Sequence, residues 1–223
     1  MAEEAKEQET HLNSDIADTW QSSVDRRLAE LSYGLGNHRH RGYDFTTKLD
    51  FDSLGSSGSV REIFIPAEAM NPTTTAGCAS LAKIEAGTND VDYWVLDFDT
   101  STAESCFFTI RMPDNWDSTT VTFVFIWTNA SGLTTETVVF GIKGRAYADS
   151  DAIDQAYGTE VTTTDTWLAQ NDIHLSPESS AVTLAGTPAA GQWCQFKITR
   201  KVASDDLTGD ARLIGVRLKY YIT

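Results

Sequence analysis

The sequence predicts a mainly β protein: an antiparallel β-sandwich of jelly-roll type, preceded by an N-terminal amphipathic helix and a linker. Two observations support this prediction. After residue 60, short segments rich in β-branched and aromatic residues recur without long helices between them. Before residue 60, apolar residues recur at helical spacing instead. This change of period divides the chain into an N-terminal attachment segment, residues 1–60, and a β-sandwich domain, residues 61–223.

Eight segments of the second part are expected to form strands. Many of them alternate apolar and polar residues with a period of two, and Thr, Ser, Asp, Asn, Gly and Pro separate them. Strands at this spacing are typical of sandwiches. The expected strands are 61–65, 93–98, 105–112, 119–127, 136–146, 181–184, 192–199 and 211–222. The stretch 149–158, DSDAIDQAYG, is expected to form one or two helical turns, capped by Asp149 or Ser150.

The N-terminal segment begins with a charged acidic tail, which we expect to be flexible, and continues as a helix over about 12–33. Asn13 or Ser14 would cap that helix, and Gly34 and Gly36 would end it. Its apolar stripe needs a partner, which is the β domain of the same chain, identical chains in a short bundle, or a larger assembly. The residues of the stripe are Leu12, Ile16, Trp20, Val24, Leu28 and Leu31.

The helix leads into a His-x-His junction, GLGNHRHRGYDF, and residues 46–60 form a linker that ends in a Ser/Gly-rich run. His38 and His40 fall on the same side of an extended chain, so one chain offers two imidazoles. Three chains around an axis would offer six, which suits an octahedral transition metal ion. The alternative is a basic junction in which Arg39 and Arg41 pair with carboxylates of a partner.

Composition narrows the class of protein. The formal net charge is −15 and the pI about 4.5, which argues against nucleic acid as a partner and against docking on an anionic membrane. An apolar run long enough to insert into a bilayer is absent from the sequence, as is the apolar core of a signal peptide, so we expect assembly in the cytoplasm. Three widely spaced cysteines predict buried free thiols.

No enzyme motif stands out, and we expect a non-enzymatic protein. The sequence lacks a nucleophile elbow, a zinc-protease motif and a phosphate-binding loop. His174 is interpreted as a solvated or hydrogen-bonded histidine at a strand edge, and Asp97 and Asp99 as the polar face of a strand. The acidic run that contains Asp149, Asp151 and Asp154 could hold calcium, although capping explains it as well.

Tryptophans are the candidate sugar contacts. Trp116 and Trp167 lie in loop-like sequence, so their rings could stack on glycans. Trp94 and Trp127 alternate with core residues and are expected to be structural. A sandwich that carries these four and Trp193 is compatible with a free carbohydrate-binding module or lectin, an interpretation that rests on fold analogy.

Four stretches together carry a resemblance to a known class of protein. They are IFIPAEAMNPTTTAGCASLAKIE, LDFDTSTAESCFFTIRMPDNWDSTTVTFVFIWT, FGIKGRAYADSDAIDQAYGTEVTTTDT and SPESSAVTLAGTPAAGQWCQFKITRKVASDDLTGDARLIGVRLKYY. Over roughly residues 62–221 they resemble a β-rich module of tailed-bacteriophage and prophage virion structural proteins, many of them fibre-like. The junction also looks like the His-x-His turns of some trimeric phage fibres.

The resemblance implies a virion component with bacteriophage proteins of the capsid or tail as partners. We therefore expect a homotrimeric surface projection, either a short tail fibre or a capsid decoration (cement) protein, anchored by its N-terminal segment. The β domain would face outward, where a host surface glycan could serve in host attachment. The alternative function is that of a carbohydrate-binding module or lectin acting in host-receptor recognition.

The two interpretations of the junction predict different results. Six imidazoles at a threefold axis would bind about one iron, nickel or zinc ion per three chains. Metal binding would weaken as the pH falls through about 6.5, because it needs neutral imidazoles. Elemental analysis of the purified trimer measures this. Absence of metal, with attachment lost in Arg39→Ala/Arg41→Ala and kept in His38→Ala/His40→Ala, would decide for the arginines.

Overall fold

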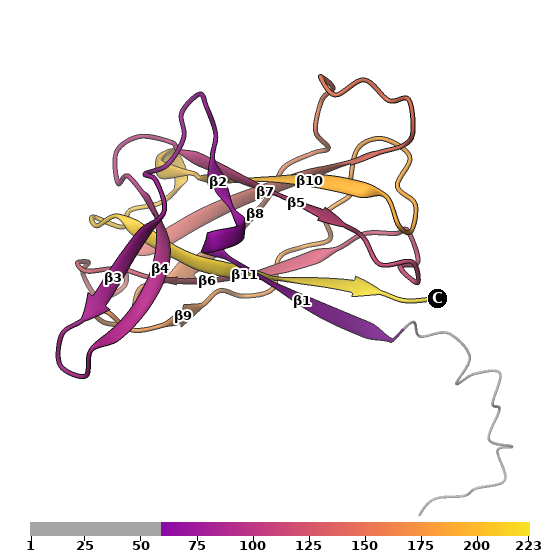
Figure 1. Ribbon diagram of the computed structural model, residues 1–223. Coiled ribbons are helices and arrows are strands. Elements are labelled where there is room, and N and C mark those ends of the chain that lie inside the picture. Colours follow the sequence, from indigo (N-terminus) through magenta and orange to yellow (C-terminus); the bar gives the residue numbers. More distant parts are fainter. Residues whose placement is uncertain (1–58) are drawn as a thin grey trace, which may run out of the picture. The chain divides into compact units, whose positions relative to one another are not determined.

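The computed structural model describes residues 59–223, which form two antiparallel β-sheets packed face to face (Figure 1). The predicted fold class, a mainly β antiparallel sandwich, is therefore confirmed. The predicted helix over 12–33, the junction and most of the linker lie outside the described residues. Within residues 59–223, no helix is long and apolar enough to cross a membrane.

Each sheet has one long central strand. Sheet A, the lower layer in Figure 1, is built around β11 (Ala211–Tyr221). Its other strands are β1 (Val60–Pro66), β3 (Ala82–Ala86), β4 (Val91–Phe98), β6 (Thr122–Thr128) and β9 (His174–Leu175). Sheet B, the upper layer, has the order β2 (Asn71–Pro72), β5 (Ser105–Arg111), β10 (Trp193–Arg200), β7 (Thr137–Tyr147) and β8 (Val161–Thr166). Two short 3-10 helices, η1 (Ala67–Ala69) and η2 (Val202–Ser204), complete the elements.

The connections follow the jelly-roll pattern, in which the chain repeatedly crosses from one sheet to the other. After β4, each strand lies in the opposite sheet from the strand before it, except that β7 and β8 form a hairpin within one sheet. On one side, β11 pairs first with β4, through Ala211–Leu213, and then with β1, through residues 215–221. On its other side, β11 pairs with β6 across a bulge between Leu213 and Gly215.

Seven of the eight expected strands are present, with ends that differ by at most three residues from the expected ones. The eighth, 181–184, forms an isolated bridge between Val182 and Val121. The helical turns expected at 149–158 are wrong. Their polar groups bond to strand β7 instead: the Gly158 amide donates to the Gly144 carbonyl, and Arg145 donates to the Ala156 carbonyl. The segment is therefore a loop.

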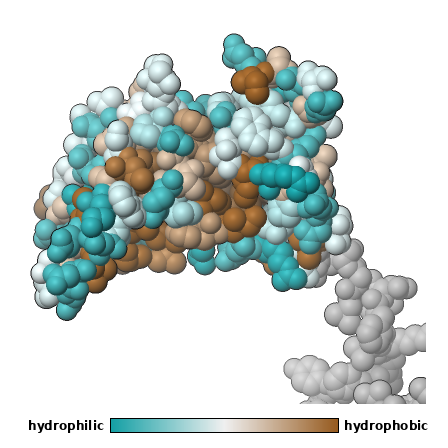
Figure 2. Space-filling model, viewed as in Figure 1, coloured by the Kyte–Doolittle hydropathy of each residue, from teal (hydrophilic) through white to brown (hydrophobic). Residues whose placement is uncertain are grey.

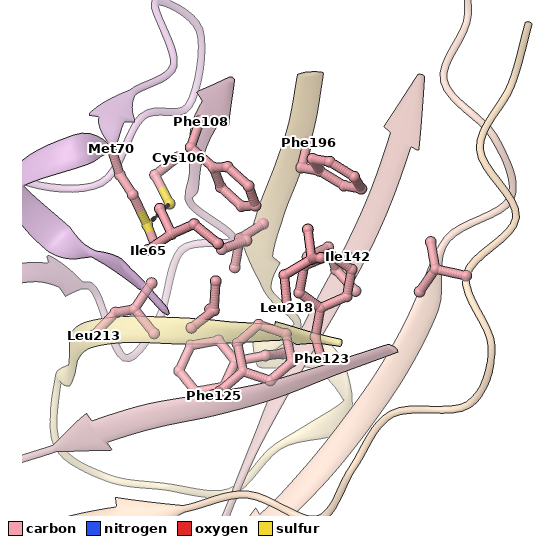
Figure 3. Close-up of a cluster of buried hydrophobic side chains, with 14 of the residues drawn as sticks. Ile65, Met70, Cys106, Phe108, Phe123, Phe125, Ile142, Phe196, Leu213 and Leu218 are labelled. Carbon is pink, nitrogen blue, oxygen red and sulfur yellow. Dashed lines mark hydrogen bonds between the residues drawn. The ribbon is translucent and has the colours of Figure 1, made fainter. Parts of the chain in front are cut away.

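Aromatic rings from both sheets fill the core (Figure 3). Phe108 and Phe196 of sheet B stack with ring centroids 5.1 Å apart, and Phe123 of sheet A meets Phe196 edge-on at 5.3 Å. Gly144 makes room for this packing, because a Cβ atom there would lie 2.6 Å from the Phe196 ring. All three cysteines are free and buried, as expected, and burial raises the pKa of Cys194 to about 12.

A fully buried arginine joins the two sheets at one end. Arg200 ends β10 in sheet B, and its side chain is 0% exposed. Its guanidinium makes a bidentate pair with Asp205, at 2.9 and 3.1 Å, and donates to the carbonyl of Phe98 at the end of β4 in sheet A. The carbonyls of Leu207 and Gly209 accept the remaining bonds. Every N–H of the group is therefore satisfied.

Removing this guanidinium should cost more stability than removing an exposed one. Arg200→Met leaves the Asp205 carboxylate buried and unpaired, so we expect the free energy of unfolding of the full chain to fall by about 3–5 kcal/mol. The control is Arg217→Met, which removes a half-exposed partner of Glu62 and should cost less than about 1 kcal/mol. Guanidinium chloride unfolding followed by tryptophan fluorescence measures both. Equal losses would show that Arg200 has no special structural role.

Candidate functional site

The outer face of sheet B gathers aromatic and basic side chains. Strands β5, β10 and β7 lie side by side, and residues two apart point to the same face. Cys194, Phe196 and Ile198 point into the core, so the residues between them point outward. In register, Trp193 lies between Arg111 and Tyr147, Gln195 between Thr109 and Arg145, and Lys197 between Phe107 and Lys143. We call Lys143, Arg145, Tyr147, Tyr157, Trp193, Gln195 and Lys197 the aromatic–basic face.

Two loops stand above this face at its opposite ends. In Figure 1 the segment after β2 rises at one end and loop 148–158 at the other, and Figure 2 shows the surface dipping between them. Gly191, with φ of +75°, turns the chain into β10 beside Arg111 and Asp114, where a Cβ would lie 2.7 Å from the Asp114 carboxylate. The face is thus open to solvent along the strands and bounded by loops at its ends.

The aromatic centre of the face is a pair of rings on neighbouring strands. The Tyr147 and Trp193 ring centroids lie 5.0 Å apart with an interplanar angle of 45°. Trp193 is 39% exposed and Tyr147 is half-buried. The Tyr147 hydroxyl donates to the carbonyl of Ile153 in loop 148–158 at 3.0 Å, which holds its ring in place. The pair therefore offers a fixed apolar surface beside polar neighbours.

Polar groups next to the rings are held by the same loop. The Tyr157 hydroxyl donates to Gln195 Oε1 at 2.6 Å, and burial, with a smaller contribution from Tyr147, raises the pKa of Tyr157. Its hydroxyl is therefore a neutral donor at physiological pH. Arg145 Nη1 donates to the Ala156 carbonyl at 2.8 Å and Nη2 to the Gln155 amide oxygen. The amide of Gln195 is left positioned to meet a ligand beside Trp193.

A second feature is a small acidic pocket of about 260 Å³ at the end of β4. Its carboxylates already have partners: Asp99 Oδ1 accepts bonds from Ser101 and Thr102, Glu104 accepts from the Asp99 amide, and Asp97 faces Arg212 at 3.4 Å. Among residues 59–223, no group of three or more side chains is arranged to hold a metal ion. Asp149, Asp151 and Asp154 do not converge into the calcium site considered above, and Asp151 instead accepts the Ala148 amide.

The predicted sugar-contact tryptophans, Trp116 and Trp167, are both buried, and that prediction is wrong. Both lie outside the regular strands, as expected. However, Trp116 forms a bridge to Ile222 beside β11 and is 1% exposed. Trp167 is 8% exposed, and its indole Nε1 donates to Asn129. Loop-like sequence indicates where a residue lies along the chain, whereas exposure depends on what packs over the loop.

Two of three further residues differ from expectation. Trp94, expected in the core, is 40% exposed because that part of β4 pairs with β3 alone, beyond the rest of sheet A. Trp127 is buried as expected. His174, expected to be a solvated or hydrogen-bonded histidine at a strand edge, lies in the edge strand β9 but is not solvated: it is 2% exposed and stacks on Trp127 with ring centroids 4.3 Å apart.

The attachment and metal residues of the N-terminal segment cannot be placed. The stripe Leu12, Ile16, Trp20, Val24, Leu28 and Leu31, together with His38, Arg39, His40 and Arg41, lies outside the described residues. The sequence did carry a signal for the aromatic–basic face that we did not use: WCQFK alternates in period two, which places Trp193, Gln195 and Lys197 on one face.

Comparison with known proteins identifies no family. No protein-family model matches the chain, and no curated protein matches its sequence. Solved structures with a similar arrangement include the CBM36-1 domain of a multidomain xylanase from the hindgut metagenome of Trinervitermes trinervoides. That match has 13% sequence identity and a TM-score of 0.39, and it covers 71% of this chain and 96% of that one. A family 35 carbohydrate-binding module from Clostridium thermocellum has 9% identity, TM-score 0.38, and coverage of 71% and 97%.

A third solved structure is the CBM22-2 xylan-binding domain of Paenibacillus barcinonensis Xyn10C, with 13% identity and a TM-score of 0.39; the match covers 70% of this chain and 92% of that one. At this level of similarity, none of these structures identifies a function for this chain.

The acidic pocket predicts opposite pH effects for two neighbouring carboxylates. Burial raises the pKa of Asp97, helped by Asp210 and Glu104 and opposed by Arg212, whereas bonds from the Ser101 side chain and from the Ser101 and Thr102 amides lower that of Asp99. Ionised Asp97 therefore destabilises the fold. This effect appears as the pH rises from the pKa of Asp97 in the unfolded chain, about 4, through its raised pKa in the folded chain. We expect Asp97→Asn to be stabilised relative to the natural chain at neutral pH, and this gain to vanish in acid.

Asp99→Asn is the matched control, with the opposite sign. Because the pKa of Asp99 is lowered by folding, its ionised form stabilises the fold when the pH is above the pKa of this group in the unfolded chain. This stabilisation is lost as the pH falls through the pKa of Asp99 in the folded chain. This variant should therefore be less stable than the natural chain at neutral pH and equal to it in strong acid. Urea unfolding between pH 3 and 8 measures both differences, and the same sign for both would contradict the assignment.

Proposed function

We propose that residues 59–223 form a non-catalytic carbohydrate-binding domain and that the aromatic–basic face is its binding surface. The observation that carries the proposal is the pair of Tyr147 and Trp193, exposed on adjacent strands and held by loop 148–158. The apolar faces of sugar rings pack on such aromatic surfaces, and their hydroxyls need hydrogen-bonding groups at the edge. Gln195 and Lys143 supply those groups on the same face, two and four residues along the strands from the rings.

The surface is formed before any ligand arrives. Tyr147, Tyr157 and Arg145 are each bonded to the loop or to a neighbouring strand, so binding requires little ordering of side chains. Ordering a side chain rich in rotamers costs about 0.5–1.5 kcal/mol, and a prepared surface avoids that cost. An open face between two loops also suits a sugar chain that passes across it, rather than a small molecule enclosed on all sides.

The proposal assigns no reaction to this domain. His174 is buried against Trp127 in sheet A, away from the aromatic–basic face. The carboxylates of the acidic pocket accept bonds from backbone amides or face Arg212. Neither group has the arrangement of an acid and a base about a shared reacting atom.

We further propose that the domain acts on a bacteriophage particle. In this setting the N-terminal segment attaches a homotrimer to capsid or tail, and the aromatic–basic face meets glycans of the bacterial surface. The virion setting is supported by the resemblance over residues 62–221, whereas the binding surface is supported by side-chain geometry. Immunogold labelling of intact particles with an antibody to the chain tests the setting independently of sugar binding.

Two tryptophans of nearly equal exposure allow a matched test of the binding surface. Trp193 on sheet B is 39% exposed and Trp94 on sheet A is 40% exposed. We expect Trp193→Ala and Tyr147→Ala to weaken binding of the full chain to a retained polysaccharide by roughly tenfold or more. Trp94→Ala should bind like the natural chain. Affinity electrophoresis in gels that contain bacterial surface polysaccharide or plant polysaccharides measures the change.

Circular dichroism of each variant separates loss of the face from loss of the fold. If the Trp193 and Tyr147 variants remain folded and bind as tightly as the natural chain, the face is not the binding surface. If the natural chain is retained by none of the polysaccharides tested, the carbohydrate-binding function itself is wrong.

A further inference from the structure

Three positive charges of the aromatic–basic face lack negative partners. Lys143 and Lys197 lie directly opposite each other on β7 and β10, and Arg145 lies two residues further along β7. Like charges directly opposite each other on neighbouring strands destabilise a sheet. Within residues 59–223, none of the three forms an ion pair, although Lys83, Arg111, Arg200, Lys201, Arg212, Arg217 and Lys219 all do.

Arg145 adds a buried positive charge whose described partners are all neutral. It is only 8% exposed, yet its guanidinium donates to a backbone carbonyl and to a side-chain amide, and neither acceptor is charged. Its Nε has no hydrogen-bond partner among the described residues. Its guanidinium carbon also lies 5.4 Å from the centre of the Tyr147 ring. A buried positive charge without a counter-charge raises the potential over the rings beside it.

Two carboxylates beside the face are already engaged. Glu160 lies over Gly141, two residues from Lys143 along β7, and its Oε1 is 2.6 Å from Lys201 Nζ. Asp114 is paired with Arg111 at 2.6 Å beside Trp193. In a chain with a net charge of −15, acidic partners are abundant, so an unpaired cluster next to the exposed ring pair calls for an external anion.

We infer that the aromatic–basic face binds an acidic polysaccharide, with one sugar ring packed on Trp193 and Tyr147 and with Lys143 and Lys197 contacting a carboxylate or sulfate further along the same sugar chain. This inference rests on the proposed carbohydrate-binding function. Both lysines are half-buried, and Lys143 Nζ lies 5.9 Å from the centre of the Tyr157 ring, which places this ammonium group on the face. Arg145, which is buried beneath the face, contributes positive electrostatic potential and makes no contact with the ligand.

The same chemistry could serve a nucleic acid, but the observations favour a glycan. Nucleic-acid binding draws its affinity from many phosphate contacts, and this face has two accessible lysines in a strongly acidic chain. A single-stranded DNA oligonucleotide is therefore one arm of the test. Retention of the oligonucleotide as tightly as the best polysaccharide, with the same loss in the lysine variants, would overturn the glycan assignment.

The experiment compares acidic polysaccharides with neutral forms of the same backbone. The probes are polygalacturonate and alginate, each beside its neutral, carboxyl-reduced form, and chondroitin sulfate beside forms that lack the sulfate, the carboxylate or both. The two singly modified forms separate carboxylate from sulfate. The full natural chain should bind at least one acidic probe roughly tenfold more tightly than its neutral form. The preference should weaken as the salt concentration rises.

Two double variants of equal net charge locate the effect. Lys143→Gln/Lys197→Gln should lose roughly tenfold or more in affinity for the acidic probe and retain its affinity for the neutral form. Lys83→Gln/Lys219→Gln removes two lysines that are paired with carboxylates elsewhere, and it should bind like the natural chain. Equal effects of the two double variants would overturn the inference.

The outcomes also separate this inference from the proposed function. Binding of neutral and acidic forms with equal affinity would overturn the charge preference and leave carbohydrate binding in place. Absence of binding to all acidic and neutral probes, together with the bacterial and plant polysaccharides above, would overturn both. Thermal unfolding of each variant shows whether a lost affinity reflects the face or the fold.

Discussion

The buried guanidinium of Arg200 is the interaction on which the geometry of sheet B depends. A charged group that is 0% exposed is tolerated because Asp205 balances its charge and three carbonyls accept its other bonds. One of those carbonyls, that of Phe98, belongs to the other sheet. The end of β10 is thereby tied to sheet A and to the loop that leads into β11. This network and the stacked Phe108 and Phe196 rings hold β10 between its neighbours.

The position of β10 decides what the outer face of the sheet presents. Because successive residues of a strand point to opposite faces, a slip of one residue would turn Trp193, Gln195 and Lys197 into the core and Cys194, Phe196 and Ile198 into water. Gly144 fixes the register on the β7 side, since it accepts the Phe196 ring where any side chain would collide. The polar, exposed face therefore derives its order from the apolar packing beneath it, and loop 148–158 then fixes the individual rings.

How much of this could be read from the sequence depends on the range of the interactions involved. Period-two alternation is local, so the long strands were predictable, and WCQFK already places Trp193 and Lys197 on one face. The sequence of loop 148–158 resembles the start of a helix because Asp149 and Ser150 are good caps. In the structure, however, the Gly158 amide bonds to strand β7 and not to a residue one helical turn away. Burial of Trp116 and Trp167 likewise depends on Ile222 and Asn129, which no local pattern connects to them.

The electrostatics of the face and of the whole chain have opposite signs, and both suit a projecting, sugar-binding part. At physiological ionic strength charges are screened over about 8 Å, so a ligand on the face interacts mainly with the charged groups nearest to it, among them Lys143, Lys197 and Arg145. The net charge of −15 of the whole chain discourages non-specific attachment to nucleic acid. Two lysines set opposite each other without a counter-charge lower the stability of the sheet, and sites of function are where such local conflicts are retained. A bound acidic sugar would resolve that conflict by supplying the missing charge.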